Sequence, residues 1–487
     1  MIRCFSTGLL AALLGLAGCA VGPDFAAPQT ALPSQDFAPR DGRDLAASLS
    51  PEPPPAAWWD LLGDPLLTAL QQEAVGGNLD LRVAASRLAQ SRAQLRIAGA
   101  AQWPALSASA GYAREGESAN GKMAALGAPS HSQNYWQAGV DARWEIDLWG
   151  HAARLREQAG AEFQASVAEA RGLQVMVAAE IARQYVLLRG MQRQIDIAVR
   201  NEAIASQVLR LAHSRERFGT GTRYDTAAAS AQWASVKALR PDLERRRDLH
   251  LNALARLLGL APRALDARLG PPRALPRPLQ QVPVGVPSEL ARRRPDIQQA
   301  QARLHAATAA VGVAQADFYP RLTLGGSLGG SLGSAAFQSG DIAHWASRQF
   351  SFGPALYLPI FEGGRLRGTL ALTQAREQEA AIVFQQTVLQ AWHEVDDALN
   401  AWAAQQRGEQ ALTQAEADSR RALHAARRAY EQGQADYLRV LMAQRQQLDS
   451  ELALARSAVA GSLSVVTLYK ALGGGWQESA PLPEAGA

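Results

Sequence analysis

The sequence of 487 residues predicts a mainly α-helical protein with a smaller β component, built from one structural unit that occurs twice. Two long stretches, about 150–216 and 365–428, contain no proline and repeat apolar side chains every three or four residues, which is the period of one buried helical face. Four shorter stretches alternate apolar and polar residues, as strands do. The order of these elements in the first half recurs in the second half.

Matching residues also indicate the duplication. Five residues of the first half recur with identical spacing in the second: Asp80, Arg87, Leu88, Pro104 and Leu106 correspond to Asp296, Arg303, Leu304, Pro320 and Leu322. Two copies indicate a duplicated fold, because a solenoid array needs at least about three short repeats. We expect the first copy at 58–259 and the second at 296–475, joined by a proline-rich equatorial linker at 260–295.

The N-terminus has the layout of a bacterial export signal. Arg3 precedes an apolar run at 5–16, so residues 1–18 are predicted to be removed as a signal peptide. Leu16-Ala17-Gly18-Cys19 resembles the lipoprotein box of bacteria, which implies that Cys19 is acylated; Ala20, where an aspartate would favour inner-membrane retention, points to the outer membrane. Residues 19–57, rich in proline and alanine, are then a lipidated tether. The two cysteines, Cys4 and Cys19, leave no internal disulfide in the mature chain.

Each long helical stretch would extend over about 100 Å, which is more than a compact globule requires. The helices end at glycine-containing turns, the tips at 217–225 and 430–437, where a helical hairpin turns back. The sequence therefore predicts two long, coiled-coil-like hairpins, followed by a C-terminal tail at 476–487.

The strand candidates lie at about 105–113, 135–147, 321–332 and 349–359. Each is about ten residues long, which is what a tilted strand needs to cross a bilayer, and aromatic side chains lie near the strand ends. Four strands cannot close a barrel, and open edges in lipid leave backbone groups unpaired, so three protomers with about twelve strands are the expected assembly. The pattern alone also fits a small soluble sheet packed on the helices.

Composition argues against several classes of function. The net charge of +4 is small for this length and the basic residues are dispersed, so nucleic-acid binding is not expected. We find no Walker loop, no His-Glu-x-x-His and no Gly-x-Ser-x-Gly motif, so the chain is not expected to be an enzyme. The eight histidines lack ligand spacing, so neither a metal site nor a cofactor is predicted.

Five strings of the chain resemble a known family, the TolC-like outer membrane efflux proteins, in particular the NodT-type outer membrane lipoproteins. The strings are Cys19-Ala20-Val21-Gly22-Pro23-Asp24-Phe25, Trp58-Trp59 with Asp64-Pro65-Leu66, Pro287-Ser288-Glu289-Leu290 with Arg294-Pro295-Asp296-Ile297, Phe361-Glu362-Gly363-Gly364-Arg365, and Tyr469-Lys470-Ala471-Leu472-Gly473-Gly474-Gly475-Trp476. Together they cover nearly the whole mature chain.

The resemblance implies a trimer with a 12-stranded β-barrel in the outer membrane and a periplasmic α-helical barrel. Such a protein is the passive exit duct of a tripartite efflux pump, and its partners are a periplasmic adaptor protein and an inner-membrane transporter of the resistance-nodulation-division (RND) type. The expected cargo is drugs or toxic compounds. Export of metal ions or proteins is the alternative within transport, and a structural periplasmic lipoprotein without a pore is the alternative outside it.

Charged residues near the two tips are candidates for a periplasmic gate, because the family closes its duct there: Glu216, Asp225, Asp418, Arg427, Arg428 and Asp436. Arg427 stands three residues before Tyr430, where members of the family often carry an aspartate, so we expect Arg427, Arg428 and Asp436 to act as a group. The alternative is that these side chains are solvated or cap helices, where exposed pairs contribute only about 0–1 kcal/mol each.

The second strand candidate separates its side chains into an apolar and a charged face. Its charged residues are expected to line a water-filled lumen: Asp141, Arg143, Glu145 and Asp147. Generic solubility of an aqueous channel is an equally good interpretation of these four.

Overall fold

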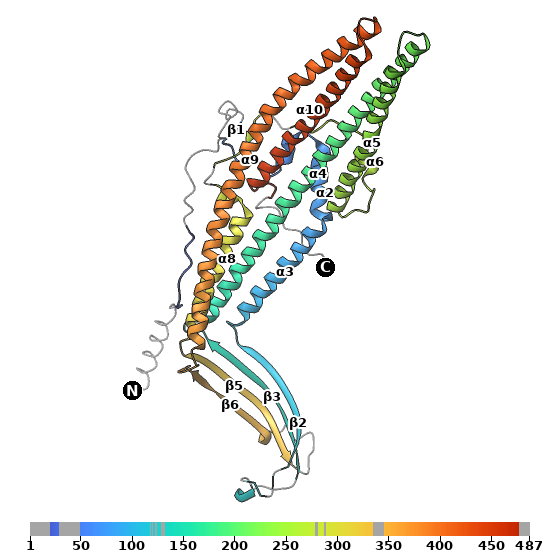
Figure 1. The fold of residues 1–487 in the computed structure, drawn as a ribbon. Coiled ribbons are helices and arrows are strands. Elements are labelled where there is room, and N and C mark those ends of the chain that lie inside the picture. Colours follow the sequence, from blue (N-terminus) through green and yellow to red (C-terminus); the bar gives the residue numbers. More distant parts are fainter. Residues whose placement is uncertain are drawn as a thin grey trace. The chain divides into compact units, whose positions relative to one another are not determined.

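The computed structural model describes residues 20–28, 49–116, 118, 120–121, 124–127, 132–277, 281–286, 289–334 and 345–476. The expected signal peptide, the lipidation residue Cys19 and most of the C-terminal tail lie outside this part. The chain divides into two compact units (Figure 1). The sheet unit comprises 1–28, 90–165 and 300–384, and the helix unit comprises 29–89, 166–299 and 385–487. Each unit combines segments of both sequence copies.

The helices come in pairs of equal length, one from each copy. α3 (Leu79–Ala100) and α8 (Pro295–Ala316) have 22 residues each. α4 (His151–Arg217) and α9 (Arg365–Glu431) have 67 each, and α5 (Arg223–Leu257) and α10 (Tyr437–Ala471) have 35 each. These lengths confirm the duplicated, mainly helical fold and the two long hairpins. Shorter helices are α2 (Pro65–Gly77), α6 (Asp266–Leu269), α7 (Leu290–Arg293), η2 (Trp58–Leu62), η3 (Ala124–Leu126) and η6 (Trp345–Ser347).

The sheet unit contains one antiparallel sheet of four strands in the order β2-β3-β5-β6. Its strands are β2 (Ala105–Glu115), β3 (Gln133–Ile146), β5 (Arg321–Ser334) and β6 (Arg348–Tyr357). The central pair is β3 and β5, so the second strand of the first copy pairs with the first strand of the second copy. β1 (Leu49–Ser50) and β4 (Val282–Pro283) form a separate short parallel pair in the helix unit.

An N-terminal strap, residues 20–25, packs on the helices of the sheet unit. The backbone N–H of Val21 donates to the Trp149 carbonyl at 3.0 Å, and the Phe25 ring stacks on His305 with ring centroids 4.3 Å apart. Gly22 has φ +99°, and a Cβ placed there would lie 2.5 Å from Gly312 Cα, so only glycine permits this backbone approach.

The largest hydrophobic cluster of the helix unit joins both copies. Trp58 is fully buried and stacks on Tyr469 of α10 with centroids 5.4 Å apart. α10 is the one described helix that is long and apolar enough to cross a membrane, but half of its most apolar window is buried within the protein. Ile181 and Tyr185 of α4 lie in the same cluster as Tyr469 of α10. Because α10 packs into this cluster, it is a core helix of the unit.

Candidate functional site

The two faces of the four-stranded sheet differ sharply in chemistry. On one face large apolar side chains point away from the protein, including Val140, Leu328, Phe350 and Phe352, which is 82% exposed. The register places Val140, Leu328 and Phe350 side by side across three strands. A row of exposed apolar residues on neighbouring strands is costly in water and favourable against lipid.

The opposite face carries the predicted lumen residues. Asp141 lies between Ser107 and Ser327 in the register, and the Ser327 and Ser351 hydroxyl oxygens are 3.0 Å apart. A polar row thus crosses all four strands at this level. Arg143, which is exposed, and Glu145 lie on the same face, with Glu145 opposite Thr323. These three side chains have the placement expected of residues that line water.

Asp147 differs from the other three. β3 ends at Ile146, and the Asp147 carboxylate accepts the backbone N–H of Ala153 at 2.8 Å. An acidic side chain that binds an unpaired N–H in the first turn stabilises a helix N-terminus. Asp147 therefore positions the start of α4, and its predicted place within the strand was wrong.

In the first hairpin, both predicted gate residues have local roles. Asp225 forms a capping box with Thr222 at the start of α5: the Asp225 carboxylate accepts the Thr222 N–H at 3.1 Å and the Thr222 hydroxyl accepts the Asp225 N–H at 3.2 Å. Glu216 faces Arg223 at 3.9 Å across the turn. The spacing Thr222-x-x-Asp225 is the sequence signature of such a cap, so this role was readable from the sequence.

In the second hairpin, the predicted residues also act mainly within their own elements. Asp436 caps α10 by accepting the Arg439 N–H at 3.1 Å. Asp418 accepts hydrogen bonds from Gln414 and Arg421 on the same helix, and these bonds lower the pKa of its carboxyl group. Arg427 donates to Gln207 of α4 at 3.4 Å, whereas the exposed Arg428 side chain has no partner among the described residues. The structure therefore does not bring Arg427, Arg428 and Asp436 into direct contact with one another.

A contact at the tip that joins the two hairpins was missed in the sequence. Arg215 of α4 donates to the backbone carbonyl of Tyr430 on α9 at 2.8 Å, and its guanidinium lies 4.4 Å from the centre of the Tyr430 ring. Tyr430 and Tyr437 are both at least nine-tenths buried, with ring centroids 6.0 Å apart. No local pattern marks Arg215 among the arginines of α4, because its partner is more than 200 positions away.

These tyrosines belong to a cluster that packs all four tip helices together. Burial is the main cause that raises the pKa of Tyr437 to about 12, followed by the neighbouring Tyr430. The cluster contains Val208 and Ala212 from α4, Ala229 from α5, Ala426 and Tyr430 from α9, and Tyr437, Val440 and Leu441 from α10. The tip is thus a small apolar core linked by Arg215.

Both halves of the chain match one known protein family. The family described as "Outer membrane efflux protein" matches residues 70–260 and 286–474, which fall on the two sequence copies. The chain belongs to the outer membrane efflux protein family. The resemblance that the sequence strings carried is therefore confirmed. This efflux protein is a channel component that works at the outer membrane, and it is not an enzyme.

Curated relatives match the efflux protein along almost its entire length. It is 32% identical to the outer membrane protein OprJ of Pseudomonas aeruginosa, over 98% of this chain and 97% of the relative. It is 32% identical to the solvent efflux pump outer membrane protein SrpC of Pseudomonas putida, over 96% and 98%. The pyoverdine export outer membrane protein OpmQ of Pseudomonas aeruginosa is also 32% identical, over 96% of both chains.

Solved structures agree with the fold of the efflux protein. The outer-membrane channel OprN matches with a TM-score of 0.85 and 33% identity, covering 94% of this chain and 100% of that chain. The outer membrane protein VceC from Vibrio cholerae matches with a TM-score of 0.79 and 30% identity, covering 87% and 100%.

Proposed function

We propose that three copies of this efflux protein form the passive outer membrane duct of a tripartite pump that expels drugs or other toxic compounds. Its partners in this proposal are a periplasmic adaptor and an inner-membrane transporter of the RND type. Relatives named for antibiotic, solvent and toluene efflux support this cargo class. A duct supplies no energy, which accords with the lack of nucleotide-binding motifs in the sequence.

The observation that carries the proposal is the open sheet. Its outer strands, β2 and β6, pair on one side only within the described part of the chain, and one face of the sheet exposes large apolar residues. In lipid, unpaired strand edges leave backbone donors and acceptors unsatisfied, so the sheet must close on itself or on further copies. A soluble sheet packed on helices has no use for a lipid-compatible face.

The duplication indicates how the sheet closes. Within one chain, β3 at the end of the first strand pair bonds to β5 at the start of the second. The same kind of join between chains pairs β6 of one protomer with β2 of the next. Three copies then give a closed barrel of about twelve strands, wide enough for a water-filled lumen. Asp141, Arg143 and Glu145 line that lumen in this arrangement.

The tip supplies the gate in our proposal. Arg215 and Tyr430 hold the hairpin of α4 and α5 to the hairpin of α9 and α10, and Arg427 adds a second link through Gln207. Opening the periplasmic end requires these hairpins to separate, so both links favour the closed state. Glu216, Asp225, Asp418 and Asp436 contribute indirectly, because they stabilise the turns and helices that present the linking residues.

Lipidation at Cys19 is part of the proposal and rests on the resemblance to the lipoprotein box. It follows that the acyl chains anchor the protein in the outer membrane beside its own barrel. The alternative cargo, metal ions or proteins, gains no specific support from the described residues.

One experiment tests the duct directly. The mature protein is purified in detergent, its particle mass is measured, and its single-channel conductance is recorded in planar bilayers. Trimer-sized particles with rare openings support a duct that is gated at its tip. A monomer that never conducts would contradict the duct and favour the structural lipoprotein.

A further inference from the structure

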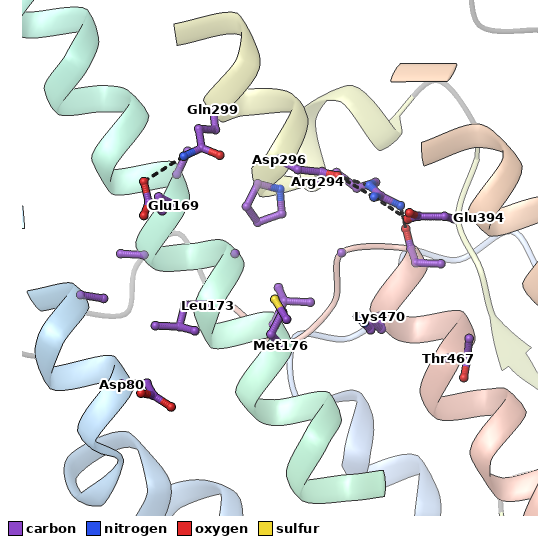
Figure 2. A pocket seen from close by; sticks show the side chains of 18 of the residues that line it. Asp80, Glu169, Leu173, Met176, Arg294, Asp296, Gln299, Glu394, Thr467 and Lys470 are labelled. Atoms are coloured by element: carbon purple, nitrogen blue, oxygen red, sulfur yellow. Dashed lines mark hydrogen bonds and ion pairs between the residues drawn. The ribbon is translucent and has the colours of Figure 1, made fainter. Parts of the chain in front are cut away.

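The helix unit contains a cavity that none of the functions above uses. It has a volume of about 1110 Å³ and is lined by parts of α3, α4, α8, α9 and α10 (Figure 2). Small-molecule sites in proteins have volumes of roughly 300–1,000 Å³. The cavity is therefore large enough to hold an organic molecule of drug size.

The lining of the cavity is mainly apolar. Leu173 and Met176 of α4 lie in its middle in Figure 2, and Val83 of α3 and Ala398 and Ala401 of α9 add to the apolar surface. Met176 is 56% exposed and Val83 is 50% exposed, so apolar surface remains uncovered there. A flexible methionine adapts to apolar groups of different shape, and uncovered apolar area favours a ligand with an apolar body.

The charged lining is acidic on balance. Five carboxylates line the cavity, against three cationic side chains: Asp80, Glu169, Asp296, Glu394 and Asp397 against Arg87, Arg294 and Lys470. Asp80 lies on one side of Leu173 and Met176 in Figure 2, and Glu394 and Lys470 lie on the other. A ligand that spans the apolar centre thus meets the Asp80 carboxylate on one side and a mixed group of carboxylates and cations on the other.

The buried cationic side chain of the lining, Arg294, is already engaged. Arg294 has a side chain that is only 8% exposed; it forms ion pairs with Asp296 at 2.6 Å and with Glu394 at 2.7 Å, and it donates to the Ala471 carbonyl at 2.8 Å. Hydrogen bonds to both carboxylates outweigh burial and raise the pKa of Arg294. Four of the five N–H donors of Arg294 are thus taken, and the residue holds the wall of the cavity together.

The other two cations differ in their contacts. Arg87 lies 3.7 Å from Glu169, whereas the exposed Lys470 forms no hydrogen bond and no ion pair among the described residues. The carboxylates of Asp80 and Asp397 are also without a hydrogen bond or an ion pair in this part of the chain. Two unpaired carboxylates thus accompany one unpaired cation, so the charge that is left for a ligand is negative on balance.

We propose that this cavity binds amphiphilic organic cations. The apolar body of the ligand packs on Leu173, Met176 and Ala398, and its cationic group is attracted by Asp80 and Asp397. This proposal rests on the proposed function in one respect: it takes the ligand to be a class of cargo that binds to the protein during export. The binding site itself is argued only from the cavity and its lining. An organic anion of the same size and shape is disfavoured by the same two carboxylates.

The test uses two probe ions of matched size, tetraphenylphosphonium and tetraphenylborate. The full mature protein is placed in lipid nanodiscs, and binding of each ion is measured by equilibrium dialysis against empty nanodiscs, which correct for partition into lipid. We expect saturable binding of the phosphonium and no saturable binding of the borate. Equal binding of both ions would overturn the proposal, because it would show apolar adsorption only.

Variants locate the site. Asp80→Asn and Asp397→Asn remove one charge each without changing shape, and each should weaken phosphonium binding by about three- to tenfold, as expected for one partly screened charge nearby. Asp449→Asn on α10 is the control, since Asp449 is exposed and lies outside the cavity. Unchanged binding in both cavity variants, or an equal loss in the control, would place the site elsewhere.

Failure of the proposed cation site can be distinguished from failure of the proposed duct. A protein that forms conducting trimers but binds neither probe contradicts the site and leaves the duct standing. A protein that binds the phosphonium and never conducts contradicts the duct and leaves the site standing.

Discussion

Arg154 of α4 donates to the Asp24 carboxylate at 2.6 Å, and through this pair the helix holds the N-terminal strap. The Arg154 side chain is only 7% exposed, whereas that of Asp24 is 92% exposed. The same guanidinium donates to the carbonyl oxygens of Val21 and Gly22 and pairs with Glu157 at 2.8 Å. One side chain thus holds the strap at three residues, Val21, Gly22 and Asp24.

Replacing Arg154 by glutamine should release the strap. The change removes the ion pair and leaves two strap carbonyls with weaker donors, and each hydrogen bond that involves a charged group contributes about 1.5–3 kcal/mol. Hydrogen exchange of the backbone N–H of Val21, followed by mass spectrometry, should then accelerate by about tenfold or more. Arg156→Gln is the control, because Arg156 lies on the same helix and bonds to Gln102 instead. Equal protection in both variants would show that the stacking of Phe25 on His305 holds the strap by itself.

Replacing Arg215 by alanine should make the duct open more often. The variant loses the hydrogen bond to the Tyr430 carbonyl and the contact of the guanidinium with the Tyr430 ring, both of which exist only while the hairpins are together. A loss of about 1.4 kcal/mol from the closed state corresponds to a tenfold increase in opening probability, measured from single-channel records. Arg217→Ala is the control, since the exposed Arg217 side chain has no partner among the described residues. A closed state that is equally persistent in both variants would remove Arg215 from the gate.

Alkaline pH should loosen the tip through Tyr437. Its pKa is raised to about 12 from 10.0 in the folded protein, mainly by burial. Below pH 10 the phenol is neutral in the folded and unfolded states, so the full stability is present; between pH 10 and 12 only the unfolded state ionises, and stability is lost as pH rises. The loss amounts to roughly 2–3 kcal/mol for this group. Thermal unfolding should thus show a smaller difference between pH 9 and pH 12 in Tyr437→Phe than in the unaltered protein, while Tyr224→Phe, which changes an exposed tyrosine, should leave the difference as it is.

A glycine in α4 permits close packing against α10. A Cβ at Gly190 would lie 2.5 Å from Cγ2 of Val459, which is itself 7% exposed. Gly190→Ala should destabilise the protein by about 1–3 kcal/mol in denaturant unfolding, because the helices must move apart. Val459→Ala removes the clashing atoms, so the double variant should recover part of that loss. Additive losses in the two single variants would show that the helices relax independently of this contact.

The elements of the fold were predictable because they depend on local periodicity. The expected helices at about 150–216 and 365–428 correspond to α4 and α9 within three residues at every end. The alternation of Trp136, Val140 and Trp144 with Asp141 and Arg143 assigned the two faces of β3 correctly, because successive side chains of a strand point to opposite faces.

The strand order and the contacts between the hairpins were not predictable, because they depend on residues that are far apart in the sequence. The order β2-β3-β5-β6 places strands from different copies together, and no single stretch of sequence specifies that choice. Likewise, charge near a turn does not by itself distinguish a helix cap from a gate, although the Thr222-x-x-Asp225 spacing does mark a cap. Asp436 satisfies the first turn of its own helix, whereas Arg215, which is unremarkable in the sequence, reaches the other hairpin. Side-chain reach in three dimensions separates these roles.

The open edges of the sheet have a genetic consequence. In the proposed three-chain ring, the wall of the pore is encoded by one gene but completed only between separate polypeptides. A cell that carries a normal allele and an allele with a blocked β2 edge would assemble mixed rings. A ring with one defective chain could not close, so the two normal chains in it would also form no pore. Such an allele would therefore be dominant over the normal one. Because β2 and β6 pair between chains in the proposed ring, a sequence change in one of these strands must remain compatible with the other.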